Sequence, residues 1–84
     1  MVDLQRFKDN LRRSFEISLV DPVVNAGPGD FSMVWVSVVS PTFEGMDEGD
    51  RQEIVWQRVL DDFEPADQKR IEFIYTDAPS EVAP

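Results

Sequence analysis

The stretch of sequence that decides the fold is FSMVWVSVVS, residues 31–40. It is rich in β-branched and aromatic residues and contains neither proline nor glycine, which is typical of a β-strand. Met33 and Trp35 fall on one face of this strand, and the other face carries Val34, Val36 and Val38. We expect the valine face to lie under helices, so that Met33 and Trp35 are partly exposed on the open side of a sheet. Exposed aromatic patches mark interaction surfaces, a homodimer interface among them.

The segment before this strand predicts its partner in a hairpin. Residues 16–24, EISLVDPVV, alternate loosely and include Pro22, which cannot donate a hydrogen bond to a sheet. We therefore predict an edge strand, or a strand with a bulge. Residues 25–30, NAGPGD, predict the turn, because glycine and proline supply the backbone angles that a reversal needs.

Helical periodicity flanks the hairpin on both sides. Before it, apolar residues recur at spacings of three and four, with Asp3 placed to cap the helix: Leu4, Phe7, Leu11 and Phe15. After it, residues 47–63 carry a broad apolar face formed by Val55, Trp56, Val59, Leu60 and Phe63. The acidic start of this second segment complements the helix dipole, and Pro65 predicts its end.

The remaining segments complete a fold of the α+β class. Residues 65–70 predict a short helical turn, and residues 71–76 predict the last strand. The predicted order is helix, strand, strand, helix, short helix, strand. Both long helices cover one face of a three-stranded mixed sheet, and a right-handed crossover adds the last strand in parallel. We predict one domain over residues 1–76 and a flexible tail over residues 77–84.

Composition excludes several classes of function. The 84 residues include no cysteine and no histidine, so disulfides, thiolate metal sites and thiol or imidazole catalysis are absent. A chain of this length has no room for a deep buried active site, and we expect no enzyme activity. No apolar run spans a bilayer and no signal peptide is recognisable at the start, so we expect a cytoplasmic protein. The net charge of −9 opposes binding to phosphate backbones.

At the end of the predicted central strand, Val39-Ser40 is followed by Pro-Thr, then Phe43-Glu-Gly45, then five residues and Arg51-Gln52 at the head of an amphipathic segment. This segment resembles the BolA family, whose topology is shared with type II KH modules. The family's own segment is a strand ending Val-Ser, two residues, Phe-x-Gly, and after five residues Arg-His. The register matches from Val39 to Trp56. The final strand and residues 78–81, APSE, are similar to the family's strand and its Thr-Pro-Glu-like ending.

The departure from the family falls at Gln52. The resemblance implies that a histidine stands here, that it ligates an iron–sulfur cluster, and that a monothiol glutaredoxin shares the cluster. A glutamine amide is a poor ligand for such a cluster, and the chain has no cysteine or histidine to replace it. We therefore expect no cofactor and no histidine-based ligation.

The leading hypothesis is a non-enzymatic interaction or regulatory module that binds an as yet unidentified protein; a glutaredoxin is implied only by the resemblance. The candidate partner-binding residues are Phe43, Gly45, Arg51, Gln52, Met33 and Trp35. Arg51 is also a candidate for an ion pair with Asp47, four residues before it on the same helical face. Residues 45–50, GMDEGD, raise the question of a cation site, but their spacing fails for a calcium loop and fits an acidic helix start.

The alternative hypothesis is a nucleic-acid-binding regulator. Its residues are the basic side chains of the first helix, Arg6, Lys8, Arg12 and Arg13. A KH module clamps the nucleic-acid backbone with a Gly-x-x-Gly loop. The corresponding residues 62–67, DFEPAD, contain no glycine and are acidic, so we expect no nucleic-acid partner.

Overall fold

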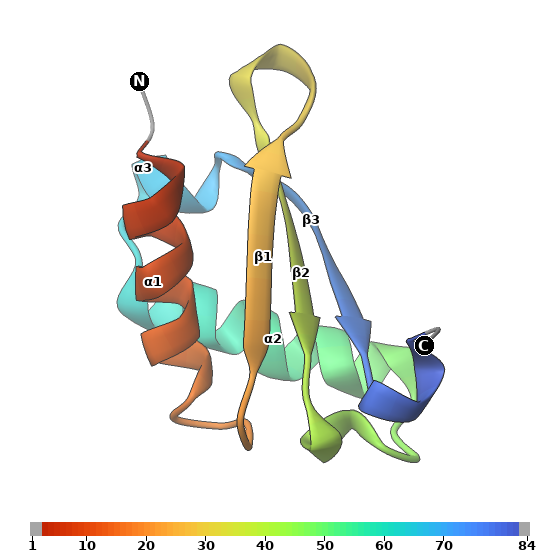
Figure 1. Ribbon diagram of the computed structural model, residues 1–84. Helices are drawn as coiled ribbons and strands as arrows, with labels where there is room; N and C mark the ends of the chain where they lie inside the picture. The colour runs from red at the N-terminus through yellow and green to blue at the C-terminus, as the bar shows by residue number, and fades with distance from the viewer. Residues whose placement is uncertain (1–2, 83–84) are drawn as a thin grey trace.

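The computed structural model describes residues 3–82 and contains a three-stranded sheet with helices on one face (Figure 1). The helices are α1 (Leu4–Phe15), α2 (Glu48–Asp62) and the short α3 (Pro65–Gln68). The strands are β1 (Val23–Pro28), β2 (Val34–Val39) and β3 (Ile71–Asp77). This element order and the α+β class are the ones predicted from the sequence.

The central strand of the sheet is β2. It pairs antiparallel with β1, in the register Val23 to Val39 and Pro28 to Val34. It pairs parallel with β3, with a register shift between Val34 and Trp35. The mixed sheet and the parallel final strand are therefore confirmed.

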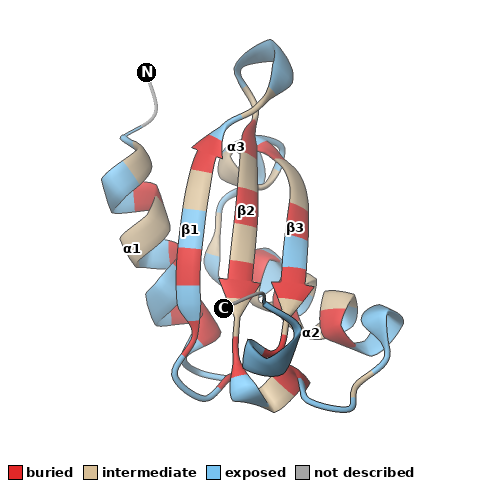
Figure 2. Ribbon diagram, turned by 45° about the vertical axis from the view of Figure 1, so that its right-hand side comes forward, coloured by how far each residue is buried: buried red, intermediate tan, exposed pale blue. Residues whose placement is uncertain are grey.

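The core lies between the sheet and the two long helices. Val34, Val36 and Val38 are buried, and in Figures 1 and 2 α2 passes behind the sheet. From the helices, the side chains that meet these valines in one cluster are Phe7, Leu11, Phe15, Val55 and Val59. The predicted valine face is confirmed, but the predicted apolar face of α2 is too broad. Leu60 is 58% exposed and lies outside the core.

The ends of the long helices follow local signals. The Asp3 carboxylate accepts a hydrogen bond from the backbone N–H of Arg6 at 3.1 Å, so the predicted cap of α1 is confirmed. Asp47 precedes α2 without a side-chain cap, and acidic Glu48 and Asp50 occupy the first turn. Phe63 ends α2 in an extended conformation two residues before Pro65.

The predicted hairpin is placed too early in the sequence. Residues 16–22 do not form a strand, because backbone N–H groups just after α1 still bond to its last turn, as in Leu19 to the Phe15 carbonyl at 2.8 Å. Asp21 has a positive φ of 42°, and Pro22 has no N–H to donate. The strand begins at Val23 and runs through residues 25–28, which the composition had predicted as a turn.

A glycine inside β1 accommodates the aromatic side chain of the neighbouring strand. A Cβ placed on Gly27 would lie 2.5 Å from a ring carbon of Trp35, its register partner. The backbone of Gly27 is not in the left-handed region, so the constraint is steric. The Trp35 indole thus lies across β1 in the space that a side chain at position 27 would occupy.

The loop between β1 and β2 shortens the strand predicted for residues 31–40. Phe31 and Ser32 have φ values of 55° and 63°, and residues 30–32 form a 3-10 turn, so β2 begins only at Val34. The Phe31 side chain is 97% exposed at the tip of this loop.

The segment predicted as a tail packs against the domain over part of its length. β3 includes Asp77, Ala78 is fully buried, and residues 79–81 form a 3-10 turn. Residues 83–84 lie outside the described residues, as do residues 1–2. The mobility of the tail stays a prediction.

The contact between Gly27 and Trp35 gives a test of the hairpin. Gly27→Ala should lower the free energy of unfolding by about 1–3 kcal/mol, because the added methyl displaces the indole. Gly49→Ala is the matched control: nothing lies within 4 Å of the position that its Cβ would take, and the helix should gain up to about 1 kcal/mol. Urea denaturation measures both.

The same substitution in a Trp35→Val background should cost close to nothing, since the colliding ring is gone. An equal cost in both backgrounds would show that Gly27 is required for a reason other than the indole.

Candidate functional site

The connector between β2 and α2 is anchored by a buried aromatic ring. Ser40 Oγ donates to the Val20 carbonyl at 2.7 Å and accepts from the Thr42 N–H at 3.2 Å, which fixes the start of the 3-10 turn over residues 41–43. Phe43 is fully buried beneath this turn. Gly45 is exposed and has a φ of +74°, a conformation that favours glycine. The chain therefore turns at Gly45 to enter α2.

Arg51 lies in the first turns of α2 and is buried, with 7% of its side chain exposed. Its guanidinium forms a bidentate ion pair with the Glu81 carboxylate, with nitrogen–oxygen distances of 2.6 and 2.8 Å. It also donates to the carbonyls of Met46 (3.0 Å) and Thr76 (3.1 Å), and it lies 5.7 Å from the centre of the Phe43 ring. The expected ion pair with Asp47 is not formed, because Glu81 takes the guanidinium.

The ion pair changes the protonation of both partners. The Arg51 guanidinium, helped by the backbone N–H of Ala78, holds the pKa of the Glu81 carboxyl at about 2, below its ordinary value of 4.5. The hydrogen bond to Glu81 in turn raises the pKa of Arg51. Both groups therefore stay charged at neutral pH, and Glu81 holds the turn after β3 against α2.

Gln52 points its amide at groups within the fold. Its nitrogen donates to the Ile74 carbonyl at 2.7 Å and to the Glu48 carboxylate at 3.0 Å. Its oxygen accepts from the indole N–H of Trp56 at 3.0 Å. The Glu48 carboxylate also accepts from the Thr76 hydroxyl at 2.7 Å. Both ends of the amide are thus engaged by α2 and β3.

Arg51 and Gln52 both bond to the outer edge of β3. The Asp77 carbonyl accepts from Ser40 N–H, so it faces β2. Carbonyls alternate in direction along a strand, so those of Ile74 and Thr76 face the free edge. These are the two carbonyls to which Gln52 and Arg51 donate. The dipeptide therefore satisfies edge groups that would otherwise pair with another strand.

This donor set does not fit an iron–sulfur cluster. The chain offers no thiolate and no imidazole, and the amide at position 52 is already bonded at its nitrogen and at its oxygen. Over residues 3–82, no three carboxylates converge in a way that would hold a metal ion.

A second candidate surface is the face of the sheet opposite the helices. Trp35 and Phe73 are register partners on this face, and Phe73 packs edge-to-face on Tyr75 with ring centres 4.7 Å apart. We call these three residues the aromatic platform. Trp35 and Phe73 are half-buried, Tyr75 is 55% exposed, and none of the three belongs to the core or packs against it. Figure 2 shows the alternation of buried and more exposed residues along β2 that creates the two faces.

The structure separates the predicted partner-binding residues into two groups. Phe43, Gly45, Arg51 and Gln52 lie together at the connector, and three of them point into the fold rather than outward. Met33 directly precedes β2 and Trp35 is its second residue; both are half-buried and apart from the core, as the alternation predicts.

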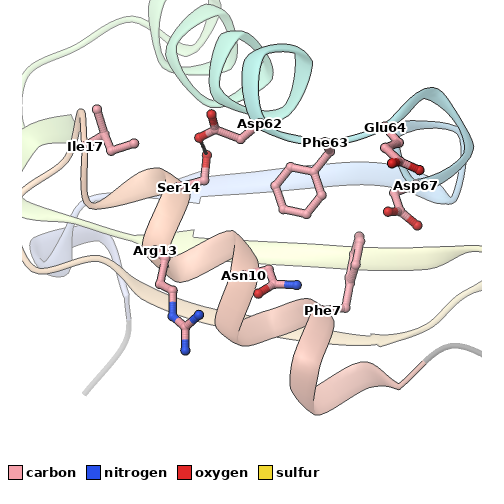
Figure 3. Close-up of a pocket in the computed structure, with 9 residues that line it drawn as sticks. All are labelled: Phe7, Asn10, Arg13, Ser14, Ile17, Asp62, Phe63, Glu64 and Asp67. Carbon is pink, nitrogen blue, oxygen red and sulfur yellow. Dashed lines mark hydrogen bonds between the residues drawn. The ribbon is translucent and has the colours of Figure 1, made fainter.

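The basic residues of α1 do not form one surface. At 100° per residue, Arg6 and Arg13 fall on one flank of the buried stripe, and Lys8 and Arg12 fall on the other. Arg12 pairs with Glu16 at 3.0 Å. Arg13 lines a groove whose other wall carries carboxylates (Figure 3), those of Asp62, Glu64 and Asp67.

The groove in Figure 3 is held at its base by contacts between α1 and the end of α2. Phe7 and Phe63 pack edge-to-face with ring centres 5.8 Å apart. Ser14 Oγ donates to Asp62 at 2.5 Å, and this bond, with one from Arg58, lowers the pKa of Asp62. The turn over residues 62–67 beside this groove contains no glycine and is acidic.

No protein-family model matches the chain, and no curated protein matches it. Among solved structures it is similar to BolA1 from Arabidopsis thaliana, with a TM-score of 0.60 and 21% sequence identity, over 90% of this chain and 95% of that one. The chain has a BolA-like fold. The BolA-like resemblance inferred from residues 39–56 is therefore supported at the level of the fold.

Sequence reasoning missed residues on both sides of the BolA-like sheet. Glu81 is separated from Arg51 by thirty positions, and nothing local marks it as the partner. Phe73 and Tyr75 had a signal that was not used: they alternate with Ile74 and Thr76 in the predicted last strand, which places the two rings on one face.

Within residues 3–82, the helices are all too short or too polar to cross a membrane.

The lowered pKa of Glu81 predicts how stability depends on pH. The folded chain binds the Glu81 proton more weakly than the unfolded chain does, so the ion pair stabilises the fold above pH 4.5 and stops doing so as the pH falls to about 2. Glu81→Gln should lower the urea midpoint at pH 7, and the difference from wild type should shrink between pH 4.5 and pH 2.5.

The matched control is Glu53→Gln, at an exposed position of α2 that has no ion pair among the described residues. It should change the midpoint little at any pH. A difference between wild type and Glu81→Gln that stays constant from pH 7 to pH 2.5 would refute the assignment.

Proposed function

We propose that this chain is a small non-enzymatic interaction module with a BolA-like fold, which binds a protein partner through the open face of its sheet. The observation that supports this most is the aromatic platform of Trp35, Phe73 and Tyr75, which lies apart from the core on the side away from the helices. Aromatic side chains exposed together on one surface are enriched in protein–protein interfaces.

The chemistry of the titratable groups supports a non-enzymatic role. The carboxyls with a shifted pKa are Asp62 and Glu81, and in both the pKa is lowered by hydrogen-bond donors. A general acid or base working near neutral pH needs the opposite shift for a carboxyl. The chain contains neither histidine nor cysteine, so it has no imidazole base and no thiolate nucleophile.

The proposal gives the connector a structural role in place of cluster ligation. Arg51 and Gln52 occupy the positions that resemble the family's Arg-His, but their donors are directed at Thr76, Ile74 and Glu81. A glutaredoxin partner, implied by the family resemblance, would therefore have to bind without a ligand from position 52. We infer that the partner contacts side chains of the sheet face instead.

Capture experiments test the interaction surface. Immobilised wild type should retain a protein from native lysate, and the double variant Phe73→Thr/Tyr75→Thr should retain at least about fivefold less, because the aromatic contact area is lost while strand propensity is kept. Leu60→Gln is the matched control, since it removes an exposed apolar side chain from α2 on the other side of the molecule.

Equal capture by all three proteins would contradict the proposal. So would capture that nuclease treatment abolishes and that Arg12→Glu/Arg13→Glu removes, which would favour nucleic-acid binding through α1 instead.

A spectroscopic experiment tests the loss of cluster ligation. Wild type co-expressed with a monothiol glutaredoxin should add no visible absorbance to that of the glutaredoxin alone, because position 52 supplies no ligand. Gln52→His restores the imidazole and should be the only variant able to change the spectrum. A shifted visible spectrum with wild type would show that another donor of this chain binds the cluster.

A further inference from the structure

The aromatic platform depends on a glycine in the neighbouring strand β1. The Trp35 indole lies across β1 only because residue 27 is glycine: any side chain would bring a Cβ within 2.5 Å of the ring. One side of the indole therefore rests on the backbone of β1. Phe73 continues the platform on β3 in the same register row, and Tyr75 follows it two residues on.

The charged side chains on the three strands all have one sign, and the nearest basic residues before β3, Lys69 and Arg70, lie beside the β1–β2 loop. None of the three strands contains a lysine or an arginine over residues 23–28, 34–39 and 71–77. β3 contributes Glu72 near the β1–β2 loop, where one of its oxygens would lie 2.9 Å from a Cβ on Gly29, and Asp77 at the opposite end. Neither forms a salt bridge among the described residues. The nearby guanidinium of Arg51 is already held by Glu81.

Aromatic faces beside unpaired carboxylates select a particular chemistry. A guanidinium stacks flat on an aromatic ring and at the same time donates two parallel hydrogen bonds to a carboxylate, which an ammonium cannot do. From the row of Trp35 and Phe73 to the row of Val39 and Asp77 the sheet extends four residues, or roughly 13 Å at ~3.3 Å per residue. An extended segment of about four residues spans that length.

Charge also argues against two other occupants. A second copy would bring the same carboxylates, and a further net charge of −9, against this face. A phosphate backbone would meet Asp77 and Glu72 with no cation on any strand to offset them.

We propose that the open face of the sheet binds an arginine-containing basic segment of a protein partner, with guanidinium groups stacked on the platform and paired with Asp77 or Glu72. This inference rests on the proposed function as an interaction module and names the chemistry of its partner.

Nuclear magnetic resonance titration of the 9.6 kDa chain tests the inference directly. The probe is octa-arginine, compared with octa-lysine and with octa-glutamate. Octa-arginine should shift the indole N–H signal of Trp35 and the β3 amides of residues 73–77, and leave the indole signal of Trp56 on α2 unchanged. It should bind at least about fivefold more tightly than octa-lysine, and octa-glutamate should not bind.

Matched variants separate the platform from the general acidity of the chain. Asp77→Asn should weaken octa-arginine binding by about fivefold, and Phe73→Thr/Tyr75→Thr by about tenfold or more. Glu53→Gln removes one exposed carboxylate from α2 and should change the affinity by less than about twofold.

Several outcomes would overturn the inference. These are equal weakening by Glu53→Gln and Asp77→Asn, shifts that map to α2, no preference for arginine over lysine, or platform signals that move with protein concentration alone, which would identify a second copy as the occupant. If octa-arginine does not bind while partner capture still depends on Phe73 and Tyr75, the proposed interaction module is supported and only the proposed arginine-containing partner segment is wrong.

Discussion

The buried guanidinium of Arg51 joins the start of α2 and the connector before it to the end of β3 and the turn after β3. It bonds to the carbonyl of the connector at Met46, to the edge carbonyl of β3 at Thr76 and to the carboxylate of Glu81, and it lies near the ring of Phe43. A buried cation is costly unless it is paired, and here an ion pair and two carbonyls satisfy it. The start of α2, the end of β3 and the turn after β3 therefore depend on one another.

This constraint gives the residues at positions 51 and 52 a structural role in the BolA-like fold. The two side chains act on the backbone of β3, where they satisfy the carbonyls of Thr76 and Ile74 on an otherwise open edge. Glutamine suits this task because its amide donates to the strand and to Glu48 while it accepts from Trp56. An uncovered edge invites pairing with other chains, and these two carbonyls of β3 are already bonded within the fold.

The sequence predicted what depends on local patterns and missed what depends on distant pairs. The valine face of β2, the Asp3 cap and the order of elements follow from periodicity and capping, which neighbouring residues determine. β1 was misplaced because Gly27 and Pro28 have the composition of a turn. Their place in a strand follows from Trp35, which needs the space above Gly27 and is eight residues further along the chain. The Arg51–Glu81 pair was missed for the same reason over a longer separation.

The steric requirement at Gly27 and the charges on β3 argue for the same surface independently. Glycine weakens a strand, so a glycine whose backbone angles are ordinary has to be explained by what occupies the space above it. That occupant is an indole that lies outside the hydrophobic core cluster. The strands that carry it have acidic side chains and no basic ones, although the chain as a whole contains eight lysines and arginines. Ring placement and charge placement thus distinguish this face from the helical side, where Arg12 and Arg58 are already paired with carboxylates.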